Sequence, residues 1–344
     1  NKIKRKLKMN NTILIISFFS LMNIFLIIYF SKIKFFHLNI DKPDNLRKIH
    51  KIPVSLAGGT LIILNLKIFW LLINFDIKLL NNEIFFNDKN SLNIFMLISY
   101  SIFFLGFFDD KLNISANIKF IISLIIIIAL IYLDTEIILN NIKFSFYEKN
   151  FVLNSYNIFF SVFCFLVFLN AFNMFDGINL QSSSYSILIF LSILFFYANT
   201  LLIKILLISL VSFSYLNYKN KAFLGDSGSL LIAFIVSYIF IKLYNLEFIN
   251  YSDEIVIYML IPGLDLIRLF VIRILKKRSP LSADRLHLHH VLISRFSQNK
   301  SLGLILSIIS LPIILNFFGM NNFFTIIGTI VLYFSILIAI QIRK

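Results

Sequence analysis

Charged residues are scarce in this sequence. Only 14% of its 344 residues are charged and 59% are hydrophobic, whereas an ordinary soluble domain has about 25% charged residues. A soluble core could not bury so many apolar side chains without leaving large apolar patches exposed, and a disordered chain needs low hydrophobicity. The composition therefore argues against a soluble enzyme and excludes a disordered protein.

Cysteine is almost absent, since Cys164 is the only one. A single cysteine excludes a disulfide scaffold and any cysteine-based zinc or iron–sulfur site. The five histidines leave only a metal site built from histidine and carboxylate groups.

Acidic residues are also few, with 17 Asp and Glu against 32 Lys and Arg. In so apolar a chain, membrane topology explains this excess before nucleic-acid binding does, and we expect no nucleic-acid partner. Regular strand alternation is missing, which argues against an outer-membrane barrel, and no internal repeat indicates a two-halved transporter. We therefore predict an all-α, polytopic membrane protein, with residues 1–344 forming a single transmembrane domain.

Long apolar runs supply the predicted spans, because a helix needs about 20 mostly apolar residues to cross a bilayer. Pro262-Gly263 interrupts one run, and we expect that helix to be broken or bent there, since proline removes a backbone donor. We predict eleven spans, at roughly 11–31, 55–75, 92–108, 120–139, 156–172, 184–198, 201–216, 228–245, 254–270, 301–318 and 322–342.

Lysine and arginine residues predict how these spans are oriented. They are concentrated in the loops that follow odd-numbered spans and are sparse in the others, so the positive-inside rule places the richer side in the cytoplasm. Residues 1–8 contradict this, because they carry five basic side chains on the opposite side. A start at Met9 would remove the conflict, and we expect residues 1–8 not to be native.

Polar clusters gather on the predicted cytoplasmic side, and the loops of the other side hold no comparable cluster. A transporter would more often place polar groups near the bilayer midplane. Polar groups at one membrane face suit an enzyme that joins a cytosolic substrate to a lipid. The predicted active-site loops lie near 32–54, 109–119, 173–183, 217–227 and 271–300.

The pair Asp109-Asp110 is the first candidate site. Adjacent carboxylates repel each other and are costly near lipid unless a cation neutralises them. Since Mg²⁺ prefers one or two carboxylates together with phosphate oxygens, the pair indicates a Mg²⁺ or phosphate site. A solvated helix cap is the alternative. Lys119 would be a phosphate-binding charge, or simply a topogenic residue.

Two further clusters lie at helix ends. Asn170, Asn173 and Asp176 share one helix face, where they could bind a sugar, a nucleotide or a metal; an interfacial cap is the alternative. Asp226 opens a helix rich in small residues, whose free N–H groups favour anions. Taken alone, Asp226 is better explained as an N-cap.

Three of the five histidines fall between positions 287 and 290. A zinc site is one interpretation, but no cysteine completes it. Together with the basic run Arg273 to Arg278, donor-rich side chains favour diphosphate binding.

In this order, the clusters resemble those of the polyprenyl-phosphate N-acetylhexosamine-1-phosphate transferases, integral membrane enzymes of glycosyltransferase family 4. The resemblance extends from about Asp41 to His290. Its HLHH form resembles the N-acetylglucosamine branch more than the muramoyl-pentapeptide branch, which carries three consecutive histidines. Its marks are DKPDNLRKIHKIPVSLAGG at 41–59, GFFDD at 106–110 followed by Lys119, NAFNMFDG at 170–177, FLGDSGS at 223–229 and ADRLHLHH at 283–290.

The resemblance implies transfer of N-acetylhexosamine-1-phosphate from a UDP-sugar to undecaprenyl phosphate, giving an undecaprenyl-diphospho-sugar and UMP. This would be the first membrane step of O-antigen, hence lipopolysaccharide, or other cell-envelope polysaccharide synthesis. It would occur at the bacterial inner membrane, with the site facing the cytoplasm. UDP-N-acetylglucosamine is the default donor, and another UDP-N-acetylhexosamine is the alternative. The resemblance also implies Mg²⁺, with Mn²⁺ as an alternative, and leaves a homodimer open.

Residue roles follow from the matching motifs. The resemblance makes Asp109, Asp110 and Asp226 catalytic and assigns Mg²⁺ to them. The implied substrate-binding residues are Arg47, His50, Lys119, Asn170, Asn173, Asp176, Arg285, His287, His289 and His290.

One position departs from the family. Its members usually continue Asp-Gly as DGxDGL or DGxNGL, whereas this chain reads DGINLQ at 176–181. Asn179 replaces the acidic option and the second glycine is missing, so no sugar or metal role is carried over to position 179. An inactive scaffold of the same fold, and less favourably a lipid transporter, stay open as alternatives.

Overall fold

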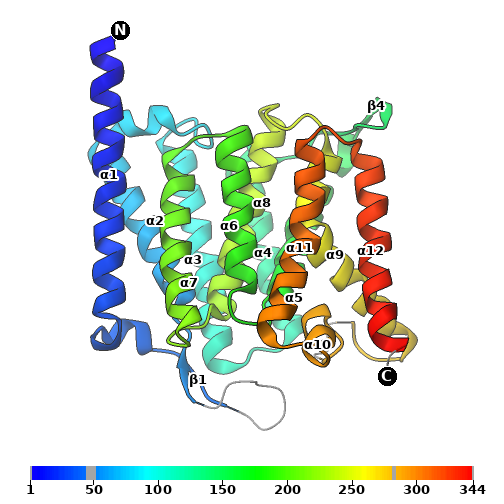
Figure 1. The fold of residues 1–344 in the computed structure, drawn as a ribbon. Coiled ribbons are helices and arrows are strands. Elements are labelled where there is room, and N and C mark those ends of the chain that lie inside the picture. Colours follow the sequence, from blue (N-terminus) through cyan, green and yellow to red (C-terminus); the bar gives the residue numbers. More distant parts are fainter. Residues whose placement is uncertain (1, 44–51, 281–283, 343–344) are drawn as a thin grey trace.

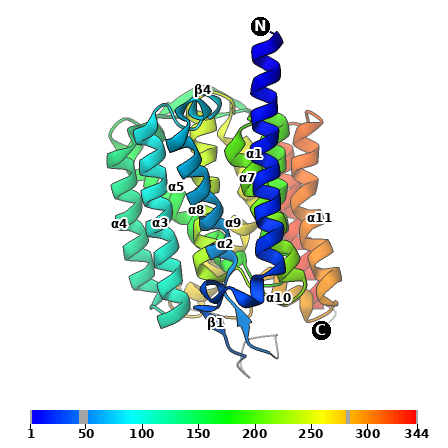
Figure 2. The ribbon, with the colours of Figure 1, turned by 90° about the vertical axis from the view of Figure 1, so that its left-hand side faces the viewer.

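A computed structural model describes residues 2–43, 52–280 and 284–342. In these ranges the chain is all-α with two small two-stranded sheets (Figures 1 and 2). The helices are α1 (Lys2–Ile28), α2 (Gly58–Phe75), α3 (Lys89–Leu112), α4 (Ala116–Leu133), α5 (Asn157–Phe175), α6 (Gln181–Ser192), α7 (Leu201–Tyr218), α8 (Gly225–Asn245), α9 (Ser252–Leu275), α10 (Leu288–Ile293), α11 (Gln298–Phe317) and α12 (Asn322–Ile342). The strands are β1 (Ile40–Asp41), β2 (Val54–Ser55), β3 (Asn141–Phe144) and β4 (Tyr147–Val152).

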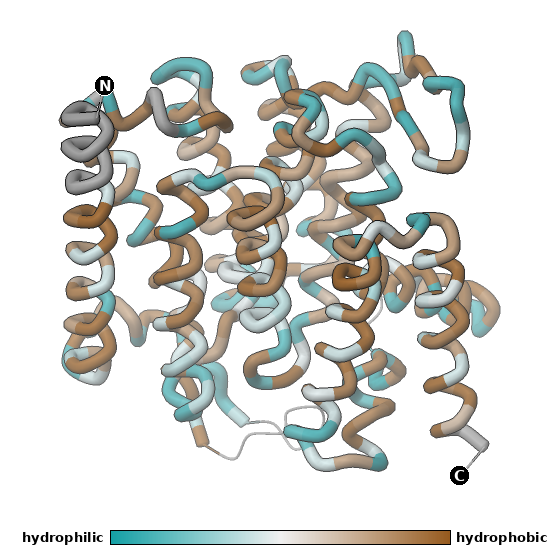
Figure 3. Tube along the Cα trace, turned by 45° about the horizontal axis from the view of Figure 1, so that its top comes forward, coloured by the Kyte–Doolittle hydropathy of each residue, from teal (hydrophilic) through white to brown (hydrophobic). Residues whose placement is uncertain are grey.

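Nine helices of the described part are long and apolar enough to span a membrane: α2 to α5, α7 to α9, α11 and α12. Two shorter apolar helices, Thr12–Ile28 within α1 and Gln181–Tyr197, match the other two predicted stretches. The second is α6 continued by a π-helical turn over Ile193–Tyr197. The predicted fold class is therefore confirmed, while a full count of eleven spans stays a prediction. Hydrophobic residues cover the helices, and hydrophilic residues gather in the loops at both ends (Figure 3).

Helix α8 forms the centre of the bundle. The apolar stretch of α8 is wholly buried, and α2, α3 and α5 pack against this helix (Figure 2). Its first turn carries small residues, so neighbouring backbones come close: a Cβ on Gly59 would lie 2.6 Å from the amide nitrogen of Gly228. This close approach fixes where the first turn of α8 lies relative to α2.

Helix α9 is continuous through Pro262, so of the two predicted alternatives the break is wrong and the bend stays a prediction. Proline leaves the carbonyl four residues earlier without its helical donor. Here that carbonyl belongs to Tyr258, and the buried Tyr185 hydroxyl donates to it at 2.6 Å. A side chain from α6 thus replaces the missing backbone hydrogen bond.

The bundle has two distinct ends. The site end, the lower one in Figure 1, carries β1, β2 and α10, while β3 and β4 lie at the opposite end. Strands β1 and β2 pair antiparallel, with Ile40 opposite Ser55, and Ser55 also bridges Ala222 before α8. These contacts tie the loop after α1 to the turn before α8. Neither small sheet was predicted.

A buried ionic cluster lies at the opposite end. Lys242 in α8 is 2% exposed, and its Nζ lies 2.6 Å from Glu136 Oε2 and 3.4 Å from Asp134 Oδ2. The Tyr238 hydroxyl also donates to Asp134, at 2.9 Å. The sequence analysis expected no comparable polar cluster in the loops of this side. It overlooked this one because Lys242 and Tyr238 lie within an apolar span.

Candidate active site

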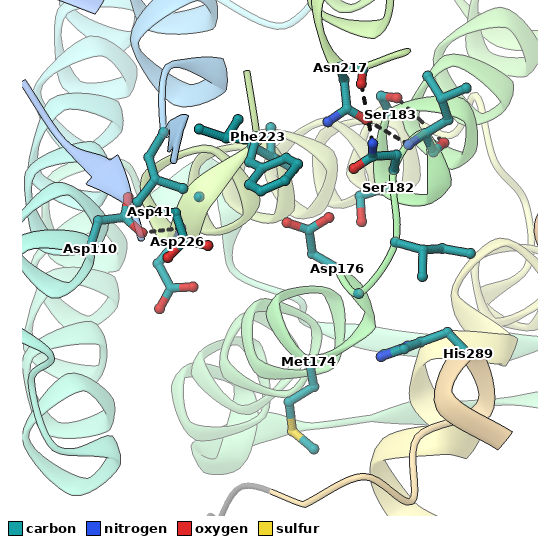
Figure 4. Close-up of a pocket in the computed structure, with 18 of the residues that line it drawn as sticks. Asp41, Asp110, Met174, Asp176, Ser182, Ser183, Asn217, Phe223, Asp226 and His289 are labelled. Atoms are coloured by element: carbon teal, nitrogen blue, oxygen red, sulfur yellow. Dashed lines mark hydrogen bonds between the residues drawn. The ribbon is translucent and has the colours of Figure 1, made fainter. Parts of the chain in front are cut away.

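A cavity of about 700 Å³ lies at the site end of the bundle (Figure 4). Its walls come from strands β1 and β2, the ends of α3 and α7, the loop between α5 and α6, the turn before α8 and the segment around α10. Of the predicted site residues, Asp109, Asp110, Asp176, Asp226, His287, His289 and His290 line it. Asp41, Ile52, Val54 and Leu56 of the first motif also line it. Residues of all five motifs therefore meet in one space, as their common membrane face predicted.

Lys119 of α4 lies between two carboxylates of this site. Its Nζ is 2.5 Å from Asp109 Oδ2 and 2.7 Å from Asp226 Oδ2. On the other side of Asp226, the Asn173 amide donates to Oδ1 at 3.0 Å and to the Ser229 hydroxyl at 2.8 Å. The side chain of Asp226 is thus held by α4 and α5.

Asp110 makes a different set of contacts from its neighbour Asp109. Its Oδ1 accepts from the Asp226 amide at 2.8 Å, and its Oδ2 accepts from the Ser227 amide at 3.1 Å. These are free N–H groups at the start of α8, where a negative charge is also favoured by the helix dipole. Gly225 permits this contact, since its φ is +72° and a Cβ there would lie 2.7 Å from Asp110 Oδ2.

Asp176 and Gly177 form the floor of the cavity next to the histidines. The Asp176 carboxyl points into the cavity between Asp226 and His289 (Figure 4). Burial raises the pKa of Asp176 to about 7, and the negative charge of Asp226 acts in the same direction. Gly177 lies directly against His289, whose ring a Cβ at position 177 would overlap.

The three histidines form one group. The His287 and His289 rings stack with centroids 5.4 Å apart and an interplanar angle of 7°, and the His290 centroid lies 4.3 Å from that of His289. Burial lowers the pKa of His289 to about 3, and it also lowers the pKa of His290. His289 is therefore neutral at physiological pH and acts as a hydrogen-bonding group rather than a charge.

Several predicted residues are not placed at the cavity. Arg47 and His50 lie outside the described residues. Asn170 and Arg285 do not line the cavity, and the Asn170 amide donates to the Leu166 carbonyl at 2.8 Å on its own helix. Lys119 and Asn173 do not line it either, but both contact Asp226. Their substrate-binding roles stay predictions.

Asn217 is a lining residue that the sequence analysis missed. Its Oδ1 accepts from the Leu180 amide at 2.7 Å, and its Nδ2 donates to the Ala222 carbonyl at 2.8 Å. Asn179, the departure from the family motif, donates to Asn220 Oδ1 at 2.5 Å. Asn179 therefore fastens the loop before α6 to the turn before α8, which an unaligned sequence could not reveal.

The donor set fits a magnesium ion better than zinc. Within the described residues, no group of three or more His, Cys, Asp or Glu side chains has a metal-binding arrangement, so the zinc interpretation gains no support. Mg²⁺ needs only one or two carboxylates when phosphate oxygens and waters complete its shell. Asp109 and Asp226 converge on one point of positive charge, the Lys119 ammonium, and so could also face a cation. The Asp110 carboxylate instead accepts hydrogen bonds from the first-turn amides of α8.

Comparison with known proteins agrees with the motifs. Residues 92–244, which include both Asp109 and Asp226, match the family model described as Glycosyl transferase family 4. The chain is 26% identical over 266 residues to proteins of Salmonella typhi and Escherichia coli (strain K12), with 74% of this chain and 69% of each relative covered. It is 26% identical over 288 residues to a protein of Thermotoga maritima, with 83% and 82% covered.

All three relatives carry the name undecaprenyl-phosphate alpha-N-acetylglucosaminyl 1-phosphate transferase. The resemblance inferred from the motifs is thereby confirmed, including the branch indicated by HLHH. The chain is a multi-pass membrane protein, and its residues 92–244 are similar to the model of glycosyl transferase family 4.

Proposed function

We propose that this protein transfers N-acetylglucosamine-1-phosphate from UDP-N-acetylglucosamine to undecaprenyl phosphate, giving undecaprenyl-diphospho-N-acetylglucosamine and UMP. The observation that carries this proposal is the meeting of Asp109, Asp226 and Lys119 beside a cavity that the three histidines also line. The names of the relatives support both the lipid and the sugar. The reaction would open O-antigen or another cell-envelope polysaccharide.

The site would face the cytoplasm from the bacterial inner membrane. The excess of lysine and arginine in the loops of the site end supports this orientation. Sugar nucleotides are cytosolic, and the lipid phosphate group lies at the membrane surface. One cavity at the site end can receive both reactants there.

In the proposed reaction, an oxygen of the lipid phosphate attacks the β-phosphorus of the sugar nucleotide. The bond from this phosphorus to the oxygen that bridges it to UMP breaks, and UMP leaves with the bond electrons. Because the second pKa of a phosphate monoester is near 6, the attacking group is largely deprotonated at pH 7 and needs no strong base. Catalysis then consists of positioning and charge neutralisation.

Different residues of the site would supply the positioning and the charge neutralisation. Mg²⁺ bound by Asp226 and Asp109 would neutralise charge on the diphosphate. Lys119 places a positive charge beside both carboxylates and would hold a phosphate oxygen. Asn173 keeps Asp226 in one orientation, and His287, His289 and His290 would hold the diphosphate or the sugar.

A transfer assay tests the proposal. The purified protein is given undecaprenyl phosphate, Mg²⁺ and each of a panel of UDP-N-acetylhexosamines, and UMP and the lipid product are measured. Product with UDP-N-acetylglucosamine is expected. Product with another sugar alone would correct the donor, and no product from folded protein would favour an inactive scaffold.

A further inference from the structure

Asp265 is a buried carboxylate of α9 that no motif assigned to the site. It is 3% exposed, and it does not line the cavity. Four groups converge on it. Its Oδ1 accepts from Arg268 Nη2 at 2.7 Å, the Tyr333 hydroxyl at 2.7 Å and the Leu288 amide at 3.1 Å, and its Oδ2 lies 3.0 Å from His287 Nδ1.

The two carboxylate oxygens of Asp265 have different partners. Oδ1 takes donors from α9, α12 and α10, which fixes the carboxylate plane. Oδ2 faces His287 Nδ1, and an ionised carboxylate can only accept. The proton of a neutral His287 must therefore sit on Nδ1, which leaves Nε2 with a lone pair for the cavity that His287 lines.

The surrounding contacts make this arrangement rigid. Arg268 also donates to the Leu286 carbonyl at 2.6 Å, and its Nε donates to the Tyr333 hydroxyl at 2.9 Å. The backbone on both sides of His287 is thus fastened to the same network. His289 then stacks on the His287 ring, so the orientation of one imidazole limits that of the next.

We propose that Asp265 is a positioning residue, which fixes the ring orientation and the tautomer of His287 so that Nε2 accepts a hydrogen bond from a hydroxyl or amide of the bound sugar nucleotide. The identity of that substrate rests on the proposed function, whereas the tautomer does not. The other tautomer would present an N–H to the cavity and could not accept. A histidine whose second nitrogen is held by a carboxylate is a known way of fixing ring orientation and proton position.

The tautomer can be measured directly on the full-length protein in lipid nanodiscs. Nitrogen-15 NMR of labelled histidine, recorded near pH 8.5, well above the usual histidine pKa of about 6.5, separates protonated from unprotonated ring nitrogens. The His287 signals are assigned by their loss in His287→Asn. We expect a protonated Nδ1 and an unprotonated Nε2, and the reverse pattern would overturn the proposal without any variant of Asp265.

Asp265→Asn tests the consequence. The amide oxygen can keep the three donors on Oδ1, but the amide nitrogen must donate to Nδ1, which moves the His287 proton to Nε2. We expect the reversed NMR pattern and a kcat about 10- to 100-fold lower. Tyr333→Phe is the matched control, because it removes one donor from Oδ1 and spares Oδ2. It should keep the wild-type tautomer and stay within about threefold of wild-type kcat.

The two claims fail in different ways. If wild-type protein shows the Nδ1 proton but transfers no sugar phosphate with any donor, the proposed function fails while the positioning by Asp265 holds. If Asp265→Asn keeps both the wild-type NMR pattern and the wild-type kcat, the positioning role is overturned while the transferase function stands.

Discussion

The Asp110 carboxylate caps the first turn of α8, with Oδ1 accepting from the Asp226 amide at 2.8 Å. Its neighbour Asp109 instead meets Lys119. Two adjacent carboxylates that a sequence presents as one pair thus have separate tasks. Asp110 accepts hydrogen bonds from the backbone of α8, whereas Asp109 forms an ion pair with Lys119.

This division predicts opposite results for two matched substitutions. Asp110→Asn places an amide N–H against the first turn of α8, so we expect a loss of about 1–3 kcal/mol in stability and a lower kcat. Asp109→Asn should keep the wild-type Tm and raise the Mg²⁺ concentration needed for half-maximal rate. Thermal unfolding and Mg²⁺ titration of the rate measure both. Equal effects of the two variants would contradict the division.

Gly177→Ala tests the contact between the loop after α5 and the histidines. The added methyl group would overlap the His289 ring, so either the ring or the loop must move. Because a displacement of about 1 Å at a reacting site costs on the order of 100-fold in rate, we expect a loss of that size. Gly263→Ala is the control, since its Cβ meets nothing within 4 Å. A Gly177→Ala rate equal to that of Gly263→Ala would show that the contact between Gly177 and His289 does not affect transfer.

Asp176 and Glu83 should make stability depend on pH. Burial raises both pKa values to about 7, from 3.8 and 4.5. A raised pKa means that the folded state holds the proton more tightly, so this stability is present at low pH and is lost as pH rises through 7. His289, with its lowered pKa, acts in the opposite direction below about 6.5.

Comparison with neutral variants isolates the two carboxyls. The Tm of Asp176→Asn minus that of wild type should increase between pH 5 and about 8, and Glu83→Gln should behave likewise. Glu83→Gln lies at the opposite end of the bundle and should leave the pH profile of transfer unchanged. A Tm difference that does not vary with pH would show that these carboxyls titrate normally.

The ionic cluster at the opposite end should contribute to stability without contributing to transfer. Lys242→Met would leave Asp134 buried without its cation, which costs about 3–5 kcal/mol. Replacing Asp134 by Asn in the same chain should restore part of that loss. The measurement is the Tm of Lys242→Met and of the double variant. A Lys242→Met protein as stable as wild type would show that the ion pairs of Lys242 do not contribute to stability.

Much of the helical architecture could be predicted because apolar runs record it directly. Each predicted stretch coincides with an apolar helix, and the polar motifs meet at one end, because helices that cross a bundle alternate in direction. The continuous α9 could not be foreseen. The Tyr185 hydroxyl that compensates for Pro262 comes from α6, which is distant in the sequence.

The site was predictable in its members but not in their pairings. Lys119 and Asp226 are 107 residues apart and meet at 2.7 Å, and the sequence held no sign that this lysine neutralises carboxylates. Asp110 was indistinguishable from Asp109 for the same reason. Asn217 carries no motif, and only the packing of helices brings it to the cavity. The contact of Tyr333 with Asp265 likewise depends on the packing of α12.

The proposed function depends most on Asp226, whose carboxylate would hold Mg²⁺ at the diphosphate. It is tested most directly by following UMP release and lipid product with UDP-N-acetylglucosamine, undecaprenyl phosphate and Mg²⁺, for wild type and Asp226→Asn in parallel. Mg²⁺-dependent product is expected from wild type, and almost none from a folded Asp226→Asn. Near-normal turnover by Asp226→Asn would contradict this expectation.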